Sequence, residues 1–413
     1  MKLGIDAVGV DRIALAVRRS GPGFLKKAYT EAELAYCAGS PERLAGRWAG
    51  KEAVIKSFDG TGICFPRRRI EILPSASGAP VVNLLGDNSR AAVELSITHH
   101  SGLAVAVATL NVPGRDAGPD LLLRPPEALD LPDRPADGHK GTFGTVVVLA
   151  GSIGYTGAAY LAATAAARAG AGIVKLLVAE SIYPILAAKC VEVMATPVPE
   201  VAPGSVGHVA HEAVTRQFHA ARSGLIGPGL GRDSSTWRLI NDLALEIECP
   251  LVIDADGLNA LSDHRRTLSR LPKGRVLTPH PGEMSRLTGS AVAEDRAGRL
   301  ELAANTAREW KAVVVLKGAR TVVAAPDGEV SEDAHEVPAL ASGGTGDVLG
   351  GLIAGLLAQG LEPFTAAVSG VYIHAEAGRR VASRLGDAGL LASDLLAEIP
   401  VIQKLLREGR VER

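Results

Sequence analysis

Five residues near the start of the chain are of types that bind a metal ion or phosphate groups. Asp6 and His99 each end an apolar run, whereas Lys51, Glu52 and Lys56 lie in the segment RLAGRWAGKEAVIKS. Mg²⁺ binds one or two carboxylates, keeps several waters and takes further ligands from phosphate oxygens. Lysine ammonium groups add positive charge for the phosphates. The set therefore predicts a site for Mg²⁺ on a diphosphate, with one carboxylate from each of two elements.

The same segment also fits a simpler interpretation. Trp48, Glu52 and Lys56 are spaced four residues apart and share one stripe of a helix. A solvated amphipathic helix with a Glu52–Lys56 ion pair would have this pattern. The positions of Asp6 and His99 at the ends of two other elements favour the metal–diphosphate site over this alternative.

A second group of residues suited to phosphate chemistry lies near the end of the chain, in ASGGTGDVLGGLIAGLL (341–357). A glycine-rich turn opens an apolar helix there, and the free N–H groups at a helix start form an anion site. Asp347 falls in the first turn. It either caps the helix or acts as a base beside a transferred phosphoryl group.

Shorter motifs rich in Gly, Asp, His and Lys accompany other strand-like runs. We expect them at one edge of a parallel sheet, beyond the carboxyl ends of the strands, where such sheets bind ligands. Each motif alone is typical of an ordinary turn. They are HKGTFG (139–144), YTGAA (155–159), IGPGLG (226–231), DADGLN (254–259), TPHPGE (278–283) and KGART (317–321).

The elements that must position the first group are of mixed type. Thr30 and Glu33 have capping-box spacing, which predicts a helix start. The pattern predicts an α+β domain of helices with a small antiparallel sheet. The expected strands are 2–8, 69–73, 81–84 and a hairpin of 93–98 with 103–110, and the expected helices begin near Asp11 and Thr30 and span 42–57.

After residue 138 the pattern changes. Apolar runs such as TVVVLAG, IVKLLVA and AVVVLKG alternate with alanine-rich helical stretches. This alternation predicts an α/β domain with a mainly parallel sheet and helices on both faces. The 47 glycines favour many close backbone approaches.

Length and composition predict more than one domain. A chain of 413 residues is too long for one ordinary domain, and residues 113–138 are rich in proline and aspartate without periodicity. We therefore predict a first domain at 1–112, a linker and the start of the second domain at 113–138, and a second domain at 139–413. Residues 1–112 carry 14 Lys/Arg against 10 Asp/Glu and the remainder 30 against 35, so the front is mildly basic.

Several classes of protein are disfavoured. Aromatic residues make up 4% and the basic excess is small, which argues against nucleic-acid binding. The uncharged run 145–167 is broken by Gly and Ser, so we expect no membrane span, and the start of the chain does not resemble a signal peptide. Four widely spaced cysteines predict neither a zinc site nor disulfides and are typical of a cytoplasmic protein.

The first domain resembles the holo-acyl-carrier-protein synthases. GIDAVGVDRI, FLKKAYTEAELAYC, RLAGRWAGKEAVIKSFDGTG and ELSITHHSGLAVAVATL occur in the order found in that family, which transfers 4′-phosphopantetheine from coenzyme A to a carrier-protein serine. The resemblance implies a homotrimer with its active site between subunits. It also implies Mg²⁺ on Asp6 and Glu52, coenzyme A contacts from Lys51, Lys56 and His99, and carrier-protein contacts from Arg12 and Lys27. The candidate base is Glu52 or a metal-bound water. Family members often carry Glu three residues after the metal Asp, where this chain has Gly9.

The second domain resembles the ADP- or ATP-dependent NAD(P)H-hydrate dehydratases, which have a ribokinase-like fold. They use a nucleotide to phosphorylate the added hydroxyl of hydrated NADH or NADPH, and loss of phosphate restores the double bond. The resemblance implies Asp347 as the base. It implies nucleotide contacts from Lys317, Gly318, Ala319, Arg320, Thr321 and Gly346, and hydrated-dinucleotide contacts from Ala158, Gly229, His280 and Asp347.

One departure leaves alternatives open for the second domain. The family usually has Gly-Asn where this chain has Glu336 and Val337. A carboxylate near bound phosphates would weaken nucleotide binding unless it faces solvent or a metal. The rival hypotheses are a silent domain that only supports the transferase, and a kinase for another small hydroxyl compound. The sequence does not distinguish ADP from ATP, nor a fatty-acid from a polyketide carrier protein.

Overall fold

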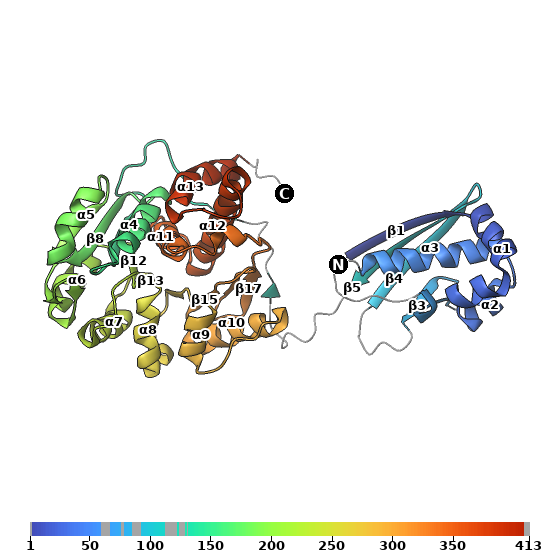
Figure 1. Ribbon diagram of the computed structural model, residues 1–413, viewed down its shortest axis with the longest axis horizontal. Coiled ribbons are helices and arrows are strands. Elements are labelled where there is room, and N and C mark those ends of the chain that lie inside the picture. Colours follow the sequence, from blue (N-terminus) through green and yellow to red (C-terminus); the bar gives the residue numbers. More distant parts are fainter. Residues whose placement is uncertain are drawn as a thin grey trace. The chain divides into compact units, whose positions relative to one another are not determined.

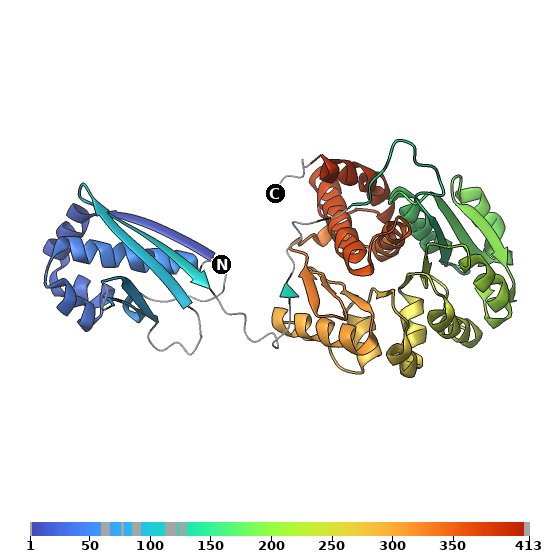
Figure 2. The ribbon, with the colours of Figure 1, turned by 180° about the vertical axis from the view of Figure 1, so that it is seen from behind.

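The computed structural model describes residues 2–58, 67–75, 78–84, 92–111, 122–123, 129 and 131–408. The chain divides into two compact units, Met1–Asp116 and Ala117–Arg413. Figures 1 and 2 show the helices and strands of each unit from opposite sides. Most of the predicted linker lies outside the described residues, so the predicted boundaries at 112 and 138 stay a prediction.

The first unit is an α+β domain, as the sequence predicted. Its main sheet has the strand order β1-β5-β4, with both pairs antiparallel, and a second sheet pairs β2 with β3. The strands are β1 (Lys2–Gly9), β2 (Ile70–Pro74), β3 (Pro80–Leu84), β4 (Ala92–His100) and β5 (Leu103–Asn111). The helices are α1 (Val10–Ala28), α2 (Glu31–Cys37), α3 (Pro41–Ser57) and the short 3₁₀ turn η1 (Arg67–Arg69).

Glycines let helix α3 lie directly on this sheet. A Cβ atom at Gly4 of β1 would lie 2.0 Å from the Ala53 carbonyl oxygen, so only glycine fits there. Gly46 and Gly50 of α3 likewise face side chains of β4 and β2 at close range. This close contact brings Lys56 of α3 beside Asp6 of β1. The capping box predicted at Thr30 and Glu33 is present at the start of α2.

The second unit is an α/β domain built on one large sheet, which confirms the predicted fold class. The strand order is β6-β17-β16-β15-β14-β13-β12-β7-β8-β9. The strands from β9 to β15 are all parallel, whereas β16 is antiparallel to both β15 and β17. The bounds are β6 (Leu122–Leu123), β7 (Thr145–Leu149), β8 (Ile173–Ala179), β9 (Met194–Val198), β12 (Ser223–Ile226), β13 (Leu251–Ile253), β14 (Arg275–Leu277), β15 (Val313–Leu316), β16 (Val322–Ala324) and β17 (Glu329–Glu332).

Two groups of helices pack on this sheet. The helices of the first group contact one another, whereas α10 of the second group packs mainly on β15 and β16. Figure 1 shows α4, α11, α12 and α13 gathered on one side. The first group is α4 (Thr156–Arg168), α5 (Tyr183–Lys189), α11 (Thr345–Ala358), α12 (Pro363–Leu385) and α13 (Ala392–Arg407). The second is α6 (His211–Phe218), α7 (Ser234–Glu246), α8 (Asp256–Asp263), α9 (Pro281–Thr288) and α10 (Arg296–Trp310).

The glycine-rich helix α11 is buried along almost its whole length. A Cβ at Gly351 would lie 2.0 Å from the Ala162 carbonyl oxygen of α4, and one at Gly355 would lie 2.5 Å from that of Ala166. The alanines of α4 and the glycines of α11 thus allow two helix backbones to approach closely. This fixes the start of α11, and with it Asp347, against the sheet edge.

The strand order reverses between β7 and β12. The chain moves outward from β7 to β8 and β9, then returns to β12 and continues in the opposite direction through β13, β14 and β15. Such a switch point leaves a crevice at the carboxyl ends of the strands, where ligands bind in α/β proteins. The loops that follow β7 and β12 carry YTGAA and IGPGLG, two of the predicted motifs.

One motif does not lie at this edge. HKGTFG (139–144) comes directly before β7, at the amino ends of the parallel strands. A Cβ at Gly144 would lie 2.1 Å from the Ala358 carbonyl oxygen, at the far end of α11 from Asp347. The prediction of six motifs at one edge is therefore wrong for this loop. Within the described part of the chain, no helix is long and apolar enough to span a membrane.

Candidate active sites in the two units

The two carboxylates predicted to hold a metal ion are both paired with cations. Lys56 donates from Nζ to Asp6 Oδ1 at 2.8 Å and to the Ile5 carbonyl oxygen at 3.0 Å. Glu52 accepts from the Nε of Arg67, whose guanidinium also lies 4.7 Å from the centre of the Trp48 ring. The alternative Glu52–Lys56 ion pair is replaced by these two pairs across different elements.

Asp6 and Glu52 are chemically suited to Mg²⁺. Both side chains are about one-fifth exposed, and the charges of both act on Lys56, whose pKa is raised chiefly by its hydrogen bond to Asp6. The described residues contain no group of three or more His, Cys, Asp or Glu side chains that could hold a metal by themselves. Two carboxylates still fit Mg²⁺ when phosphate oxygens and waters complete its shell.

Lys51 does not lie at this site, which corrects the prediction that it contacts coenzyme A phosphates. Its ammonium is fully buried and lies 2.6 Å from Glu33 Oε2. It also donates to the carbonyl oxygens of Ala28, at 2.8 Å, and Arg67, at 2.9 Å. An ammonium has three N–H groups, so these partners leave Lys51 no donor for a ligand.

The other predicted residues of the first unit are solvent-accessible. His99, at the end of β4, lies with Nε2 3.0 Å from the Glu42 carbonyl oxygen. Arg12 and Lys27 are exposed near opposite ends of α1. Sequence reasoning assigned no role to Arg67, although the run Arg67–Arg69 was a visible signal of positive charge.

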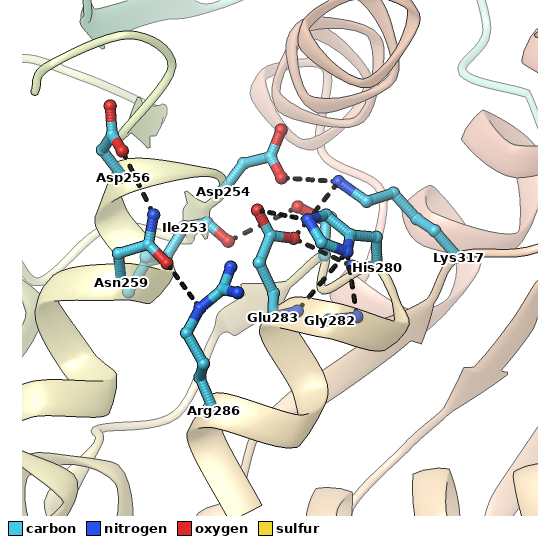
Figure 3. A network of polar contacts seen from close by, with 10 residues as sticks. Ile253, Asp254, Asp256, Asn259, His280, Gly282, Glu283, Arg286 and Lys317 are labelled. Carbon is cyan, nitrogen blue, oxygen red and sulfur yellow. Dashed lines mark hydrogen bonds and ion pairs between the residues drawn. The ribbon is translucent and has the colours of Figure 1, made fainter. Parts of the chain in front are cut away.

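In the second unit, the ends of three neighbouring strands bring charged groups together (Figure 3). Lys317, directly after β15, donates from Nζ to Asp254 Oδ1 at 2.9 Å, and Glu283 Oε2 lies 3.8 Å from the same nitrogen. Asp254 follows β13, and Glu283 lies in the first turn of α9, after β14. A Cβ at Gly346 would lie 3.4 Å from Lys317 Nζ, so the ammonium faces the start of α11.

Two carboxyl groups at this site have strongly raised pKa values. The pKa of Asp347 is raised to about 7. Burial is the largest cause, and the negative charge of Asp254 is the next largest. Burial likewise raises the pKa of Glu283 to about 7, against the opposing effect of Lys317. The pKa of Lys317 is itself raised, because the carboxylates outweigh the effect of its burial. A carboxyl group that titrates near neutral pH is suited to accept a proton during catalysis.

The predicted nucleotide loop, 317–321, is held by two side chains that the sequence did not reveal as important. Arg299 Nη2 donates to the carbonyl oxygens of Leu316, Lys317 and Arg320 at 3.2 to 3.4 Å. Glu332 accepts from Arg320 Nε at 3.0 Å. Thr321 donates to the Gly318 carbonyl oxygen at 3.2 Å, and Ala319 is exposed at the tip of the loop.

Glu336, the departure from the family pattern, faces solvent beside this loop. Its side chain is 65% exposed, and Oε1 lies 3.8 Å from Arg320 Nη1. The carboxylate is therefore hydrated and near a cation, the arrangement in which its charge has the smallest effect on a bound phosphate.

The residues predicted to contact the hydrated dinucleotide fall in two places at the same sheet edge. Gly229 has a φ of 64°, and a Cβ there would lie 3.2 Å from the Ala158 Cβ, so the loop after β12 touches the first turn of α4 at the switch point. His280 caps α9, with Nδ1 accepting from the Gly282 backbone N–H at 3.0 Å, and it lies beside Glu283 in Figure 3. Burial, with the nearby charge of Lys317, lowers the pKa of His280.

The structure combines a small α+β domain with an α/β domain that gathers buried charged groups at the carboxyl ends of its parallel strands. Residues 146–401 match the family model described as NAD(P)H-hydrate dehydratase, and residues 2–108 match that of the 4′-phosphopantetheinyl transferase superfamily. The chain belongs to the NAD(P)H-hydrate dehydratase family and carries a phosphopantetheinyl transferase domain before it. Both resemblances predicted from the sequence are confirmed.

Named relatives agree with this assignment for the second unit. The chain is 46% identical over 278 residues to the bifunctional NAD(P)H-hydrate repair enzyme Nnr of Moorella thermoacetica, covering 67% of this chain and 52% of that protein. It is 38% identical over 274 residues to the ADP-dependent (S)-NAD(P)H-hydrate dehydratase of Xanthomonas campestris, covering 66% of this chain and 92% of that protein. The chain thus spans about half the length of several curated relatives that it matches.

A solved structure of a similar protein supports the same family assignment for the second unit. The ADP/ATP-dependent NAD(P)H-hydrate dehydratase of Bacillus subtilis, co-crystallised with ATP and Mg²⁺, is 33% identical with a TM-score of 0.57. The match covers 68% of this chain and 95% of that chain. A ribokinase-like superfamily protein of Enterococcus faecalis is 28% identical with a TM-score of 0.57, and the match covers 66% of this chain and 91% of that chain. This similarity confirms the ribokinase-like fold of the second unit.

Proposed function

We propose that the chain is a bifunctional enzyme with two independent sites. The first unit transfers 4′-phosphopantetheine from coenzyme A to a serine of an acyl carrier protein. The second dehydrates NAD(P)H-hydrate at the expense of ADP or ATP. The observation that carries the second activity is the convergence of Lys317, Gly346 and Asp347 at the sheet edge, within a region that matches the dehydratase family.

In the first unit, Asp6 and Glu52 would hold Mg²⁺. The ion would neutralise charge on the diphosphate of coenzyme A. Lys56, whose side chain is half exposed beside Asp6, would bind a phosphate oxygen. Glu52 is the candidate acceptor for the proton of the attacking serine hydroxyl. The new bond joins that oxygen to the β-phosphorus, and 3′,5′-ADP leaves.

We propose that the first unit assembles as a homotrimer. One face of its main sheet is covered by α3, whereas the other carries Leu3, Ile5 and Leu103, which are 58%, 52% and 43% exposed. An exposed apolar sheet face is typical of a protein–protein interface. Light scattering of the full chain would give three times its mass, and a monomer at all concentrations would contradict the proposal.

In the second unit, the start of α11 and Lys317 would bind the phosphates of the nucleotide. Asp347 would take the proton of the dinucleotide hydroxyl as its oxygen attacks the terminal phosphorus. The bond between that phosphorus and the shortened nucleotide breaks. Phosphate then leaves the dinucleotide together with a proton from the neighbouring carbon, and the electron pair of that C–H bond forms the double bond. The exposed position of Glu336 favours an active domain over the silent one.

Paired assays on one preparation test the proposal. Coenzyme A, Mg²⁺ and an apo carrier protein should add the phosphopantetheine mass to the serine, and chelation of Mg²⁺ should stop this. Hydrated NADH with ADP or ATP should recover NADH absorbance. Asp6→Ala should abolish only the first activity and Asp347→Ala only the second.

Each rival hypothesis has its own outcome in these assays. A silent second unit would give no nucleotide-dependent recovery of NADH. A small-molecule kinase would instead release ADP from ATP with a stable phosphorylated product. Loss of both activities in one folded single variant would contradict the independence of the two sites.

A further inference from the structure

Asp254 is a buried charge to which neither the sequence motifs nor the proposed reaction assigns a role. It directly follows β13, and its side chain is 1% exposed. One carboxylate oxygen, Oδ1, accepts from Lys317 Nζ at 2.9 Å. The other, Oδ2, faces α11, because a Cβ at Gly350 would lie 3.4 Å from it. The carboxylate therefore lies between the sheet edge and the first turns of α11.

The position of Lys317 requires such a partner. Its ammonium faces Gly346 in the first turn of α11, and the start of a helix carries partial positive charge. Without a neighbouring carboxylate, an ammonium would be repelled from this place. Glu283 is the weaker partner, since it lies 3.8 Å away and its Oε2 also accepts from the His280 backbone N–H at 2.9 Å. Asp254 is thus the group that fixes Lys317.

The charge of Asp254 also acts on Asp347. The other groups that face Asp347 are Asp256 of α8, Glu283 of α9 and Lys317 after β15. His374 of α12 donates from Nε2 to the Thr345 carbonyl oxygen at 2.8 Å, and burial lowers its pKa to about 4, so it is neutral at pH 7. After burial, Asp254 makes the largest contribution to the raised pKa of Asp347.

We propose that Asp254 is a positioning residue for phosphoryl transfer, which holds the Lys317 ammonium at the start of α11 and keeps Asp347 a competent proton acceptor. This inference rests on the proposed dehydratase function. The ammonium and the acceptor carboxyl lie on different elements, after β15 and in α11. Of the two buried carboxylates that act on both, Asp254 and Glu283, Asp254 makes the direct hydrogen bond to Lys317 and has the larger effect on Asp347. The DADGLN motif (254–259) thereby gains a function in the reaction.

Two variants that each remove one charge test the inference by moving a pH profile in opposite directions. Asp254→Asn keeps an oxygen that can accept from Lys317 but removes the negative charge. It should lower kcat about 10- to 100-fold and move the acid limb of the kcat/KM profile about one pH unit lower. Lys317→Gln removes the positive charge and should move that limb higher. A purely structural role would change kcat and stability without opposite shifts.

The test has a control variant and a direct measurement of the Asp347 pKa. Asp242→Asn makes the same change at a surface carboxylate that pairs with His208, and should leave the profile unchanged. Titration of the Asp347 carboxyl carbon by ¹³C NMR, assigned with Asp347→Asn, should give a lower pKa in Asp254→Asn than in the wild type. If Asp254→Asn does not fold, the neutral pair Asp254→Asn with Lys317→Gln should fold. Its Asp347 pKa should lie below that of Lys317→Gln alone, because these two proteins differ only in the charge of Asp254.

The possible outcomes separate this inference from the proposed function. A wild-type protein without nucleotide-dependent recovery of NADH would overturn the proposed function, whereas the NMR titration would still test the charge relationship. If the wild type is active, and Asp254→Asn has the same pH profile and the same Asp347 titration as the wild type, the inference is overturned. The proposed function is not affected by that result.

Discussion

The ammonium of Lys51 and the carboxylate of Glu33 lie 2.6 Å apart in the first unit, and neither side chain is exposed to solvent. Glu33 also accepts from the backbone N–H groups of Thr30 and Ile72, at 2.8 and 2.9 Å. The pair therefore joins α3, the start of α2 and strand β2. Burial lowers the pKa of Lys51, against the opposing effect of Glu33.

Breaking this pair should destabilise the first unit strongly. Lys51→Met leaves a buried carboxylate without its cation, which typically costs about 3 to 5 kcal/mol. Chemical denaturation of the full chain, followed by Trp48 fluorescence, would measure the change. Lys56→Met removes a lysine one turn and a half further along the same helix. Its side chain is 53% exposed, so solvent screens its ion pair and the loss of stability should be much smaller than for Lys51→Met. Equal losses in both variants would contradict this assignment.

Replacing Asp347 by Asn should stabilise the second unit while abolishing dehydration. The carboxyl pKa rises from its ordinary value of 3.8 to about 7 in the folded protein. The folded state therefore binds the proton more tightly, and stability falls as pH rises from about 4 to about 7. Asn lacks this penalty, so its advantage should be near zero at pH 4 and on the order of 1 to 3 kcal/mol at pH 8. A Tm difference that does not change with pH would argue against the raised pKa.

Removing the charge of Glu336 should improve nucleotide affinity only slightly. The carboxylate is exposed and 3.8 Å from Arg320, so Glu336→Gln should lower the Kd for ADP about two- to five-fold at low salt. The gain should disappear at high ionic strength. Calorimetric titration with ADP would measure it, with Glu248→Gln, at another exposed glutamate, as the control. A gain of a hundred-fold would instead identify Glu336 as a block on the nucleotide site.

Arg299 should be needed for nucleotide binding although it lies on α10, outside the predicted motifs. It donates to the Leu316, Lys317 and Arg320 carbonyl oxygens, so Arg299→Gln should loosen the loop and raise the KM for the nucleotide about 10-fold. The change in kcat should be smaller. Arg308→Gln, at an exposed position of the same helix, should leave the KM unchanged.

Local patterns in the sequence determined much of this protein. The capping box at Thr30, the strand-length apolar runs and the change of rhythm after residue 138 predicted the elements because they reflect contacts between residues close in the chain. The same patterns predicted both fold classes, and the quoted motifs identified both families. The roles of the site residues remain predictions, to be tested by the variants above.

Tertiary structure alone decided which charged residues meet. Lys51 and Lys56 are five positions apart on one helix, and only the packing of α3 on the sheet buries the first and leaves the second beside Asp6. Lys317 and Asp254 are far apart in sequence and meet because β15 and β13 end at the same edge of the sheet. The periodicity of a sequence predicts which residues share one face of a helix or strand. Burial and charge pairing depend instead on strand order and helix packing, because these bring together distant parts of the chain.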